Sequence, residues 1–365
     1  MRPLRPNSRG AVVPTPSRIG THRPEHPFSR PSTALSRLDK VREGASPSIL
    51  IIRSRGGIGD VLMTTPTVRS VAKKYNCKVD YCTDYSYLDG ALEKVVRGIP
   101  YIGKVFDIEE LQAHQEEYDA VINLTCPCTS HEKPLAPPVN RIDLFANHAA
   151  IKLDSPKMDY VMLNEDIEEA RAYLSNMNLL QYKLVLVQPS SSHEARDAPF
   201  IRVKEAMAAL SQRDKNIVFL VITHNSDNVK VPWELYHTHV LQNFDIRQIA
   251  AIMFHCDLVL CPDSAILHMA SALSKKTCTI FGPTDPRARV NYHPEAVAIW
   301  PGKELKNYPC WYSDPKDGYM CWKRLESEVI VEVCFSLLNN SPLPASRDLV
   351  TYGSYRHVSS DYEII

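Results

Sequence analysis

The chain lacks several features that would assign it to a common class. Its 42 basic and 42 acidic side chains balance, so no overall charge draws it to nucleic acid or to an anionic membrane. No apolar run approaches the roughly 20 residues that a membrane-spanning helix requires, and no continuous apolar segment of a secretory signal is present. We therefore expect a soluble, cytoplasmic protein with no transmembrane segment.

Cysteine is present without the spacing typical of a metal site. None of the ten cysteines forms a CxxC pair, and several lie in apolar runs, which favours buried thiols. We expect no metal centre. Two groups leave a metal or redox site open: Cys126 with Cys128 near His131, and Cys310 with Cys321.

Standard nucleotide fingerprints are also missing. The glycines Gly56, Gly57 and Gly59 do not fit GxGxxG, and no GKS or GKT follows them. A dinucleotide oxidoreductase is therefore the least favoured enzyme class.

The length and hydrophobic content predict two domains. A chain of 365 residues with 44% hydrophobic side chains exceeds the size at which single cores usually stop growing. Residues 1–45 carry eight arginines and seven prolines, which predicts a disordered basic tail. We expect a first domain over 46–165, a hinge over 166–182, a second domain over 183–340 and a polar C-terminal tail over 341–365.

Within both domains, apolar runs of strand length alternate with segments of helical periodicity. Strands are predicted over 48–52, 78–82, 120–124, 184–187, 217–222, 258–260 and 277–280. Helices are predicted over 61–71, 86–97, 202–213, 246–254 and 264–273. This order predicts two parallel α/β sheets in tandem, with a ligand bound between them beyond the carboxyl ends of the strands.

Asp60 stands out in the first domain because it follows the first predicted strand and begins a helix. A carboxylate at this place can act as a general base toward an acceptor hydroxyl. It can equally cap its own helix, and the residue alone does not decide between the two roles.

Two strand-to-helix turns stand out in the second domain. Asp263 and Ser264 begin a helix that carries His268, and Thr284 with Asp285 follows the next strand. Backbone N–H groups at such turns bind anions. Each residue also has an ordinary structural role, as a helix cap or a buried histidine, but two such turns on neighbouring strands favour a phosphate-bearing ligand.

Three segments make the chain resemble a known family: 55–66 (RGGIGDVLMTTP), 263–270 (DSAILHMA) and 281–286 (FGPTDP). Together they resemble the ADP-heptose:lipopolysaccharide heptosyltransferases, glycosyltransferase family 9, over about residues 48–335. The resemblance implies a GT-B architecture, with two Rossmann-like domains facing each other across a cleft. It also implies inverting, metal-independent sugar transfer, and no DxD motif of a GT-A enzyme is found where one would be needed.

The resemblance also implies roles for individual residues. Asp60 matches the catalytic base, and Arg196 matches a basic residue that contacts the donor phosphate. The other implied donor-site residues are Asp227, Asp263, Ser264, Ala265, His268, Gly282, Thr284 and Asp285. The implied acceptor-side loop contains Arg55, Gly57, Gly59 and Thr64.

The chain departs from the family pattern at two places in the donor site. Ala265 stands where the family commonly has glycine, and 223–227 (THNSD) replaces a glycine-rich turn, so that only Asp227 loosely fits the ribose-binding acid. The identities of the sugar and the nucleotide stay open.

The predicted activity is transfer of a heptose-like sugar from a nucleotide-diphosphate sugar, with ADP as the expected nucleotide. No other cofactor is expected. The acceptor is a hydroxyl of a glycan or a lipid-linked, lipopolysaccharide-like saccharide, and peripheral membrane contact stays open. Two alternatives remain: a glycosyltransferase that acts on modified DNA held by residues 1–45, and a non-catalytic nucleotide-sugar or glycan-binding module.

Overall fold

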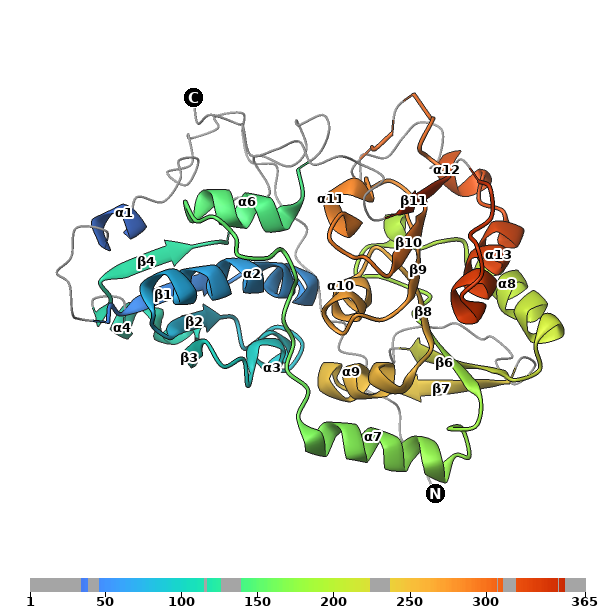
Figure 1. The fold of residues 1–365 in the computed structure, drawn as a ribbon, viewed down its shortest axis with the longest axis horizontal. Helices are drawn as coiled ribbons and strands as arrows, with labels where there is room; N and C mark the ends of the chain where they lie inside the picture. Colours follow the sequence, from blue (N-terminus) through green and yellow to red (C-terminus); the bar gives the residue numbers. More distant parts are fainter. Residues whose placement is uncertain are drawn as a thin grey trace, which may run out of the picture.

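The computed structural model describes residues 34–38, 46–114, 117–125, 139–223, 237–306, 308–310, 320–346 and 348–351. Its strands form two separate sheets, which lie on the left and on the right in Figure 1. This confirms the predicted pair of α/β sheets. No helix of the described residues is long and apolar enough to cross a membrane.

The first sheet has four parallel strands in the order β3-β2-β1-β4. Its central strand, β1 (Ile49–Arg53), is buried along its whole length, as expected for a parallel strand covered on both faces. The other strands are β2 (Val79–Thr83), β3 (Ile102–Asp107) and β4 (Ala120–Asn123). The helices of this half are α1 (Ala34–Leu38), α2 (Ile58–Tyr75), α3 (Ala91–Val96), α4 (Leu111–His114) and α6 (Arg141–His148).

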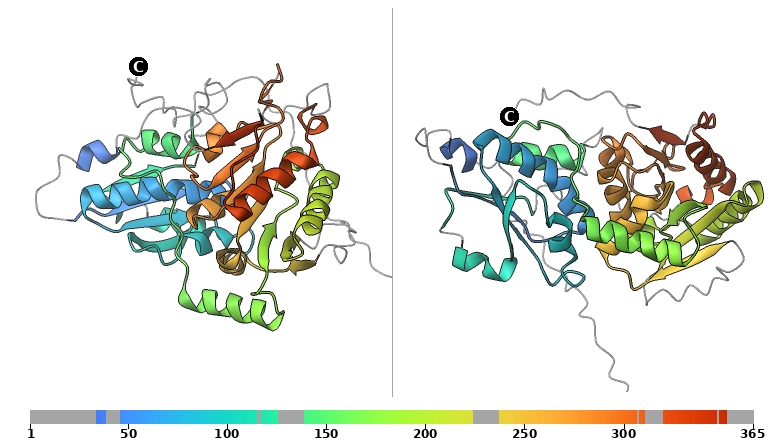
Figure 2. Two further views of the ribbon diagram at one scale, coloured as in Figure 1. Left: turned by 45° about the vertical axis from the view of Figure 1, so that its right-hand side comes forward. Right: turned by 60° about the horizontal axis from the view of Figure 1, so that its bottom comes forward.

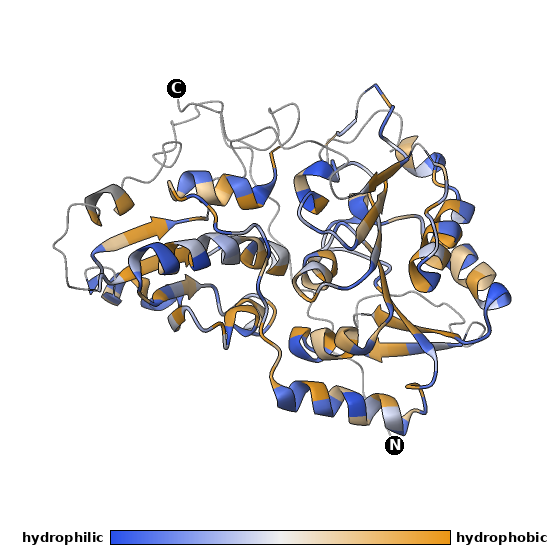
Figure 3. Ribbon diagram, in the orientation of Figure 1, coloured by the Kyte–Doolittle hydropathy of each residue, from blue (hydrophilic) through white to orange (hydrophobic). Residues whose placement is uncertain are grey.

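The second sheet has the order β11-β10-β9-β8-β5-β6-β7 and is parallel except at β11. Its strands are β5 (Lys183–Val187), β6 (Ile217–Thr223), β7 (Thr238–Gln242), β8 (Leu258–Pro262), β9 (Thr277–Ile280), β10 (Ala296–Ile299) and β11 (Leu349–Thr351). Its helices are α7 (Asn164–Asn176), α8 (Phe200–Arg213), α9 (Ile246–His255), α10 (Ala265–Ala272), α11 (Arg287–Val290), α12 (Met320–Lys323) and α13 (Ser327–Asn339). Figure 3 shows the strands as mainly hydrophobic and the outer helices as mixed.

Three segments differ from the predicted organisation. The segment predicted as a hinge is largely helix α7, which buries only Ala170 and Leu174 and therefore lacks a strong apolar signal. Within the predicted basic tail, Leu35 and Leu38 of α1 are buried. Within the predicted C-terminal tail, β11 pairs with β10 and covers that edge of the sheet.

The sheet order brings the functional candidates together. In each sheet, successive strands are first added on one side of the starting strand and later strands are added on its other side. This change of side occurs between β1 and β4 in the first sheet and between β5 and β8 in the second. Ligands bind at such points, beyond the carboxyl ends of the strands. Helices α2 and α10 begin there and pack against each other, and the right-hand view of Figure 2 shows the two halves side by side.

Candidate active site

The turn between β1 and α2 places Asp60 at the junction of the two halves. Gly57 is the N-cap of α2, and its N–H donates to Oδ2 of Asp60 over 3.1 Å, so the carboxylate does help to cap the helix. Gly56 has φ +108°, and a Cβ there would lie 2.5 Å from both Nη2 of Arg53 and Oδ2 of Asp60. The turn therefore requires glycine at this position.

Two arginines hold the Asp60 carboxylate. Arg141, the first residue of α6, pairs with Oδ1, and Nη2 of Arg53 lies 3.3 Å from Oδ2. Burial alone would raise the pKa of Asp60, but Arg141, Arg53 and Arg289 outweigh it and hold this pKa far below its usual range. Asp60 is thus a firmly ionised carboxylate whose proton affinity depends on its arginine partners.

Arg53 links the turn that carries Asp60 to the end of β4. Its Nη1 donates to the backbone oxygens of Leu124 (2.7 Å) and Thr125 (2.5 Å), and its guanidinium lies 5.2 Å from the centre of the Phe145 ring. One buried side chain therefore joins the carboxyl ends of β1 and β4 to Asp60.

Gly59 allows the two halves to approach closely. A Cβ on Gly59 would lie 2.5 Å from Cδ2 of His268 in α10. Any larger residue would push the two helices apart at this point. Nearby, Tyr292 of the second half donates to Asp143 of α6 at 2.9 Å, which adds a second direct link.

Asp263 is the centre of the second-domain cluster and is only 2% exposed. Thr284 donates its hydroxyl to Oδ2 over 2.9 Å, and Arg289 and Arg196 lie 3.7 and 3.9 Å from the two carboxylate oxygens. Burial alone would raise the pKa of Asp263, but Arg289, Arg196, His268 and the Thr284 hydroxyl outweigh it and lower this pKa.

The residues that flank Asp263 have defined partners. Ser264 is the N-cap of α10 by position, but its hydroxyl donates to Oε1 of Gln188 at the end of β5 instead of capping the helix. Ala265 is the first residue of α10 and is half-buried. The Asp285 carboxylate is fully buried and pairs with the guanidinium of Arg287.

His268 lies on α10 between these two clusters and is 3% exposed. Burial lowers its pKa to about 4, Asp263 and Asp60 oppose this shift, and Arg289 and Arg141 add to it. The His293 ring packs edge-on against it, with ring centres 5.4 Å apart. Nδ1 of His268 and both ring nitrogens of His293 are buried without a hydrogen-bond partner among the described residues.

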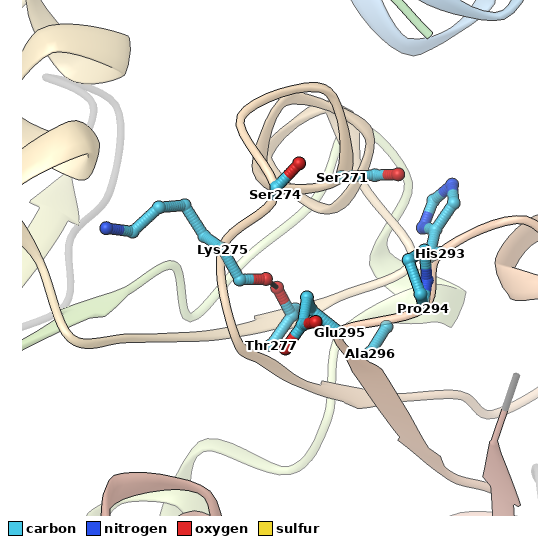
Figure 4. A pocket seen from close by; sticks show the side chains of 8 residues that line it. All are labelled: Ser271, Ser274, Lys275, Thr277, His293, Pro294, Glu295 and Ala296. Carbon is cyan, nitrogen blue, oxygen red and sulfur yellow. Dashed lines mark hydrogen bonds between the residues drawn. The ribbon is translucent and has the colours of Figure 1, made fainter. Parts of the chain in front are cut away.

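A small cavity lies beside His293 (Figure 4). Its volume of about 10 Å³ matches one water molecule and is far too small for a sugar. The cavity by itself therefore cannot hold a nucleotide sugar.

Comparison with known proteins assigns the family. A sequence model of glycosyltransferase family 9 (heptosyltransferase) matches residues 128–316, just over half of the chain. The chain belongs to glycosyltransferase family 9. This confirms the resemblance seen in the sequence, and the protein is a glycosyltransferase. A search of curated proteins finds no match.

Solved structures show the same fold at low identity. A glycosyltransferase family 9 protein from Veillonella parvula DSM 2008 has 16% identity and a TM-score of 0.63, over 81% of this chain and 98% of its own. An ADP-heptose lipopolysaccharide heptosyltransferase II from E. coli has 14% identity and a TM-score of 0.59, over 80% and 99%. The E. coli heptosyltransferase WaaC with ADP-2-deoxy-2-fluoro heptose has 16% identity and a TM-score of 0.53, over 79% and 99%. The architecture is GT-B, with two Rossmann-like domains.

Some residues predicted for this glycosyltransferase's site lie elsewhere or play structural roles. Thr64 does not lie on the acceptor-side loop, because it faces inward from α2, is fully buried and bonds to the Tyr81 hydroxyl at 2.9 Å. Arg55 is exposed on that loop. At Gly282, a Cβ would lie 2.1 Å from the Trp322 ring, so packing of that ring by itself requires glycine.

Four residues that contact the predicted site residues were not themselves predicted: Arg53, Arg141, Gln188 and Arg289. Arg53 is the last residue of β1, two residues before the first glycine-rich segment, and nothing in the sequence shows that its guanidinium lies beside Asp60. Arg289 influences the pKa of Asp60, Asp263 and His268, and so joins the two clusters electrostatically.

The remaining predicted residues belong to the ribose-binding position and to the two cysteine groups. Asp227, Cys126, Cys128 and His131 lie outside the described residues. No disulfide joins Cys310 to Cys321 in the described part of the chain. Within the described ranges no group of three or more His, Cys, Asp or Glu side chains is arranged to hold a metal ion.

Proposed function

We propose that this glycosyltransferase moves a heptose-like sugar from a nucleotide-diphosphate sugar, with ADP as the nucleotide, to a hydroxyl of a glycan or lipopolysaccharide-like acceptor, with inversion and without a metal. The family assignment supports the reaction class. The ADP-heptose named for the matched E. coli enzymes supports the donor. The family match begins at residue 128, so it does not bear on Asp60.

One observation carries the proposal. Asp60, an ionised carboxylate of the first domain, lies close to the second-domain cluster that contains Arg196 and Arg289 around Asp263. The contact of Gly59 with His268 sets this closeness, and Arg289 lies within the electrostatic reach of both Asp60 and Asp263. A base for an acceptor and cations for a diphosphate then lie on opposite sides of one junction.

In the proposed reaction, Asp60 takes the proton of the acceptor hydroxyl. The hydroxyl oxygen forms a bond to the anomeric carbon of the donor, and the bond from that carbon to the diphosphate oxygen breaks on the opposite face. The electron pair of the broken bond stays on the diphosphate. Arg196, Arg289 and the N–H groups at the start of α10 stabilise this leaving group, and Asp60 later releases its proton to solvent.

The Arg141 contact has a consequence for Asp60. We infer that an acceptor hydroxyl which bonds to Oδ1 of Asp60 displaces Arg141 from that oxygen. When that guanidinium leaves, the pKa of Asp60 rises and the carboxylate becomes a better base. Binding of the acceptor thereby activates the group that deprotonates it.

The test compares the parent protein with Asp60→Asn over a panel of ADP- and UDP-sugars with lipopolysaccharide-core acceptors. We expect Asp60→Asn to lower the rate of nucleotide-diphosphate release by about 10²- to 10⁴-fold, since a positioned general base contributes that much. We expect the variant to bind donor as the parent does, as measured by thermal shift. A donor at 100 times its dissociation constant stabilises the protein by about 2.7 kcal/mol.

Asp154→Asn is the matched control. Asp154 is also paired with an arginine, Arg69 of α2, but at the far end of that helix. We expect this variant to keep the parent rate. If the parent protein binds donor but transfers no sugar over the whole panel, it is a binding module. If no ADP- or UDP-sugar stabilises the parent protein, the proposed donor is refuted.

A further inference from the structure

The loop between β2 and α3 contains three successive residues in the left-handed backbone region. The φ angles are +45° at Leu88, +52° at Asp89 and +77° at Gly90. A bulky residue such as leucine rarely adopts this conformation, which persists only where the surrounding structure enforces it. Leu88 buries little in return, because it remains 63% exposed.

Hydrogen bonds on both sides hold this loop in its strained form. The backbone N–H of Tyr85 donates to Asp107 over 3.0 Å, and that of Ser86 donates to Asp84 over 2.9 Å. At the other end, the N–H of Ala91 donates to the carbonyl oxygen of Tyr87 over 3.2 Å. These hydrogen bonds restrict the loop, and with it Tyr87, to one position.

That place is the junction of the two domains. The hydroxyl oxygen of Tyr87 lies 3.5 Å from the position that a Cβ on Gly57 would occupy, next to the turn that carries Asp60. Burial raises the pKa of Tyr87, the Asp60 carboxylate adds to the rise, and the Arg196 guanidinium opposes it. The half-buried phenol therefore lies within reach of both a first-domain carboxylate and a second-domain cation.

We propose that Tyr87 is the aromatic wall of the transfer site, against which the sugar ring of the acceptor packs and which keeps water from the anomeric carbon of the donor. This inference rests on the proposed function of Asp60 and Arg196. Aromatic side chains commonly line such sites, and exclusion of water suppresses competing hydrolysis. In that side reaction, a water oxygen instead of the acceptor oxygen bonds to the anomeric carbon, which releases free sugar and the nucleotide diphosphate.

The experiment measures transferred sugar and free sugar in the same reaction, with the ADP-sugar that the parent protein uses. For Tyr87→Ala we expect the acceptor KM to rise about tenfold and the ratio of transfer to hydrolysis to fall about tenfold, because the ring face that contacts the sugar is lost; a tenfold change corresponds to about 1.4 kcal/mol. The donor KM stays at the parent value. Tyr87→Phe keeps the ring, so we expect its acceptor KM and its transfer ratio to change much less than those of Tyr87→Ala.

Tyr85→Ala is the control within the same loop. Tyr85 is also half-buried, but the charges that raise the pKa of its phenol are Glu93, Glu110 and Asp107, whereas Asp60 and Arg196 act on Tyr87. We expect its acceptor KM and transfer ratio to match the parent. Thermal melts verify folding, and Tyr87→Leu, which retains apolar bulk without the ring, replaces Tyr87→Ala if that variant is unfolded.

Three results would overturn the inference while leaving the proposed function in place. They are parent-like values for Tyr87→Ala, a rise in donor KM instead of acceptor KM, and an equal loss in Tyr87→Phe and Tyr87→Ala. A parent protein that neither transfers nor hydrolyses any donor refutes the proposed function, and this inference falls with it.

Discussion

The buried His268 makes stability depend on pH in a defined interval. Its folded pKa is about 4, mainly because burial disfavours the charged ring. In an unfolded chain histidine titrates near pH 6.5, so between these two values only the unfolded state binds the proton. Stability therefore falls as the pH falls through this interval. Acidification from pH 7 to pH 5 costs about 2 kcal/mol for His268 alone, at 1.36 kcal/mol for each unit of pKa shift.

The other buried groups of the site change the expected curve in known directions. Burial and the neighbouring His268 also lower the pKa of His293, so His293 adds to the same loss. Asp60 and Asp263 have lowered pKa values, because their arginine partners outweigh burial. Their contribution is present above about pH 4 and is lost only below it. The interval from pH 7 to pH 5 therefore separates the histidines from these carboxylates.

The assay is urea unfolding at pH 7 and at pH 5, followed by tryptophan fluorescence, for the parent, His268→Gln and His193→Gln. Glutamine does not titrate, so we expect His268→Gln to lose about 2 kcal/mol less than the parent between the two pH values. His193 is exposed, and its replacement leaves the parent dependence unchanged. An equal pH dependence in the parent and His268→Gln would refute the reasoning.

Two further substitutions test the site. Gly282→Ala places a methyl group 2.1 Å from the Trp322 ring, and we expect it to lower the free energy of unfolding, measured with urea, by about 1–3 kcal/mol. Gly57→Ala, whose new methyl group has its nearest contact at 3.5 Å, should lower this free energy less. Equal losses in the two variants would contradict the packing argument. Arg141→Gln removes an ion pair from Asp60 and should shift the acid limb of the transfer pH profile to higher pH, whereas an unshifted limb would show that Arg141 does not control Asp60.

Much of the fold follows from local pattern. Strands such as β1, β6 and β8 are continuous apolar runs, and the helices that follow β1 and β8 have clear periodicity. The elements that were not predicted include β10 and α13, which are apolar and buried, and also β7 and β11, which have weak local signals because tertiary contacts stabilise them. Strand β7 is an edge strand with one buried residue, and β11 exists only through its pairing with β10.

The candidate site divides in the same way. Asp60, Asp263 and Thr284 could be predicted because each follows a strand at a turn, and a turn is a local property of sequence. The arginines around them could not. Arg141 is 81 residues from Asp60, and Arg289 meets Asp263 only because β8 and β9 are neighbours in the sheet.

The sequence by itself determined the class of this protein: two α/β domains, the turns that present polar groups, and the family to which these turns belong. Only the tertiary structure decided the electrostatic state of the site. Whether a carboxylate is a base or a helix cap depends on its burial and on the charges within a few ångströms, and these come from chain segments far away in the sequence. The same holds for Thr64, which the motif placed on the acceptor-side loop and which the packing of α2 against β2 turns into the core.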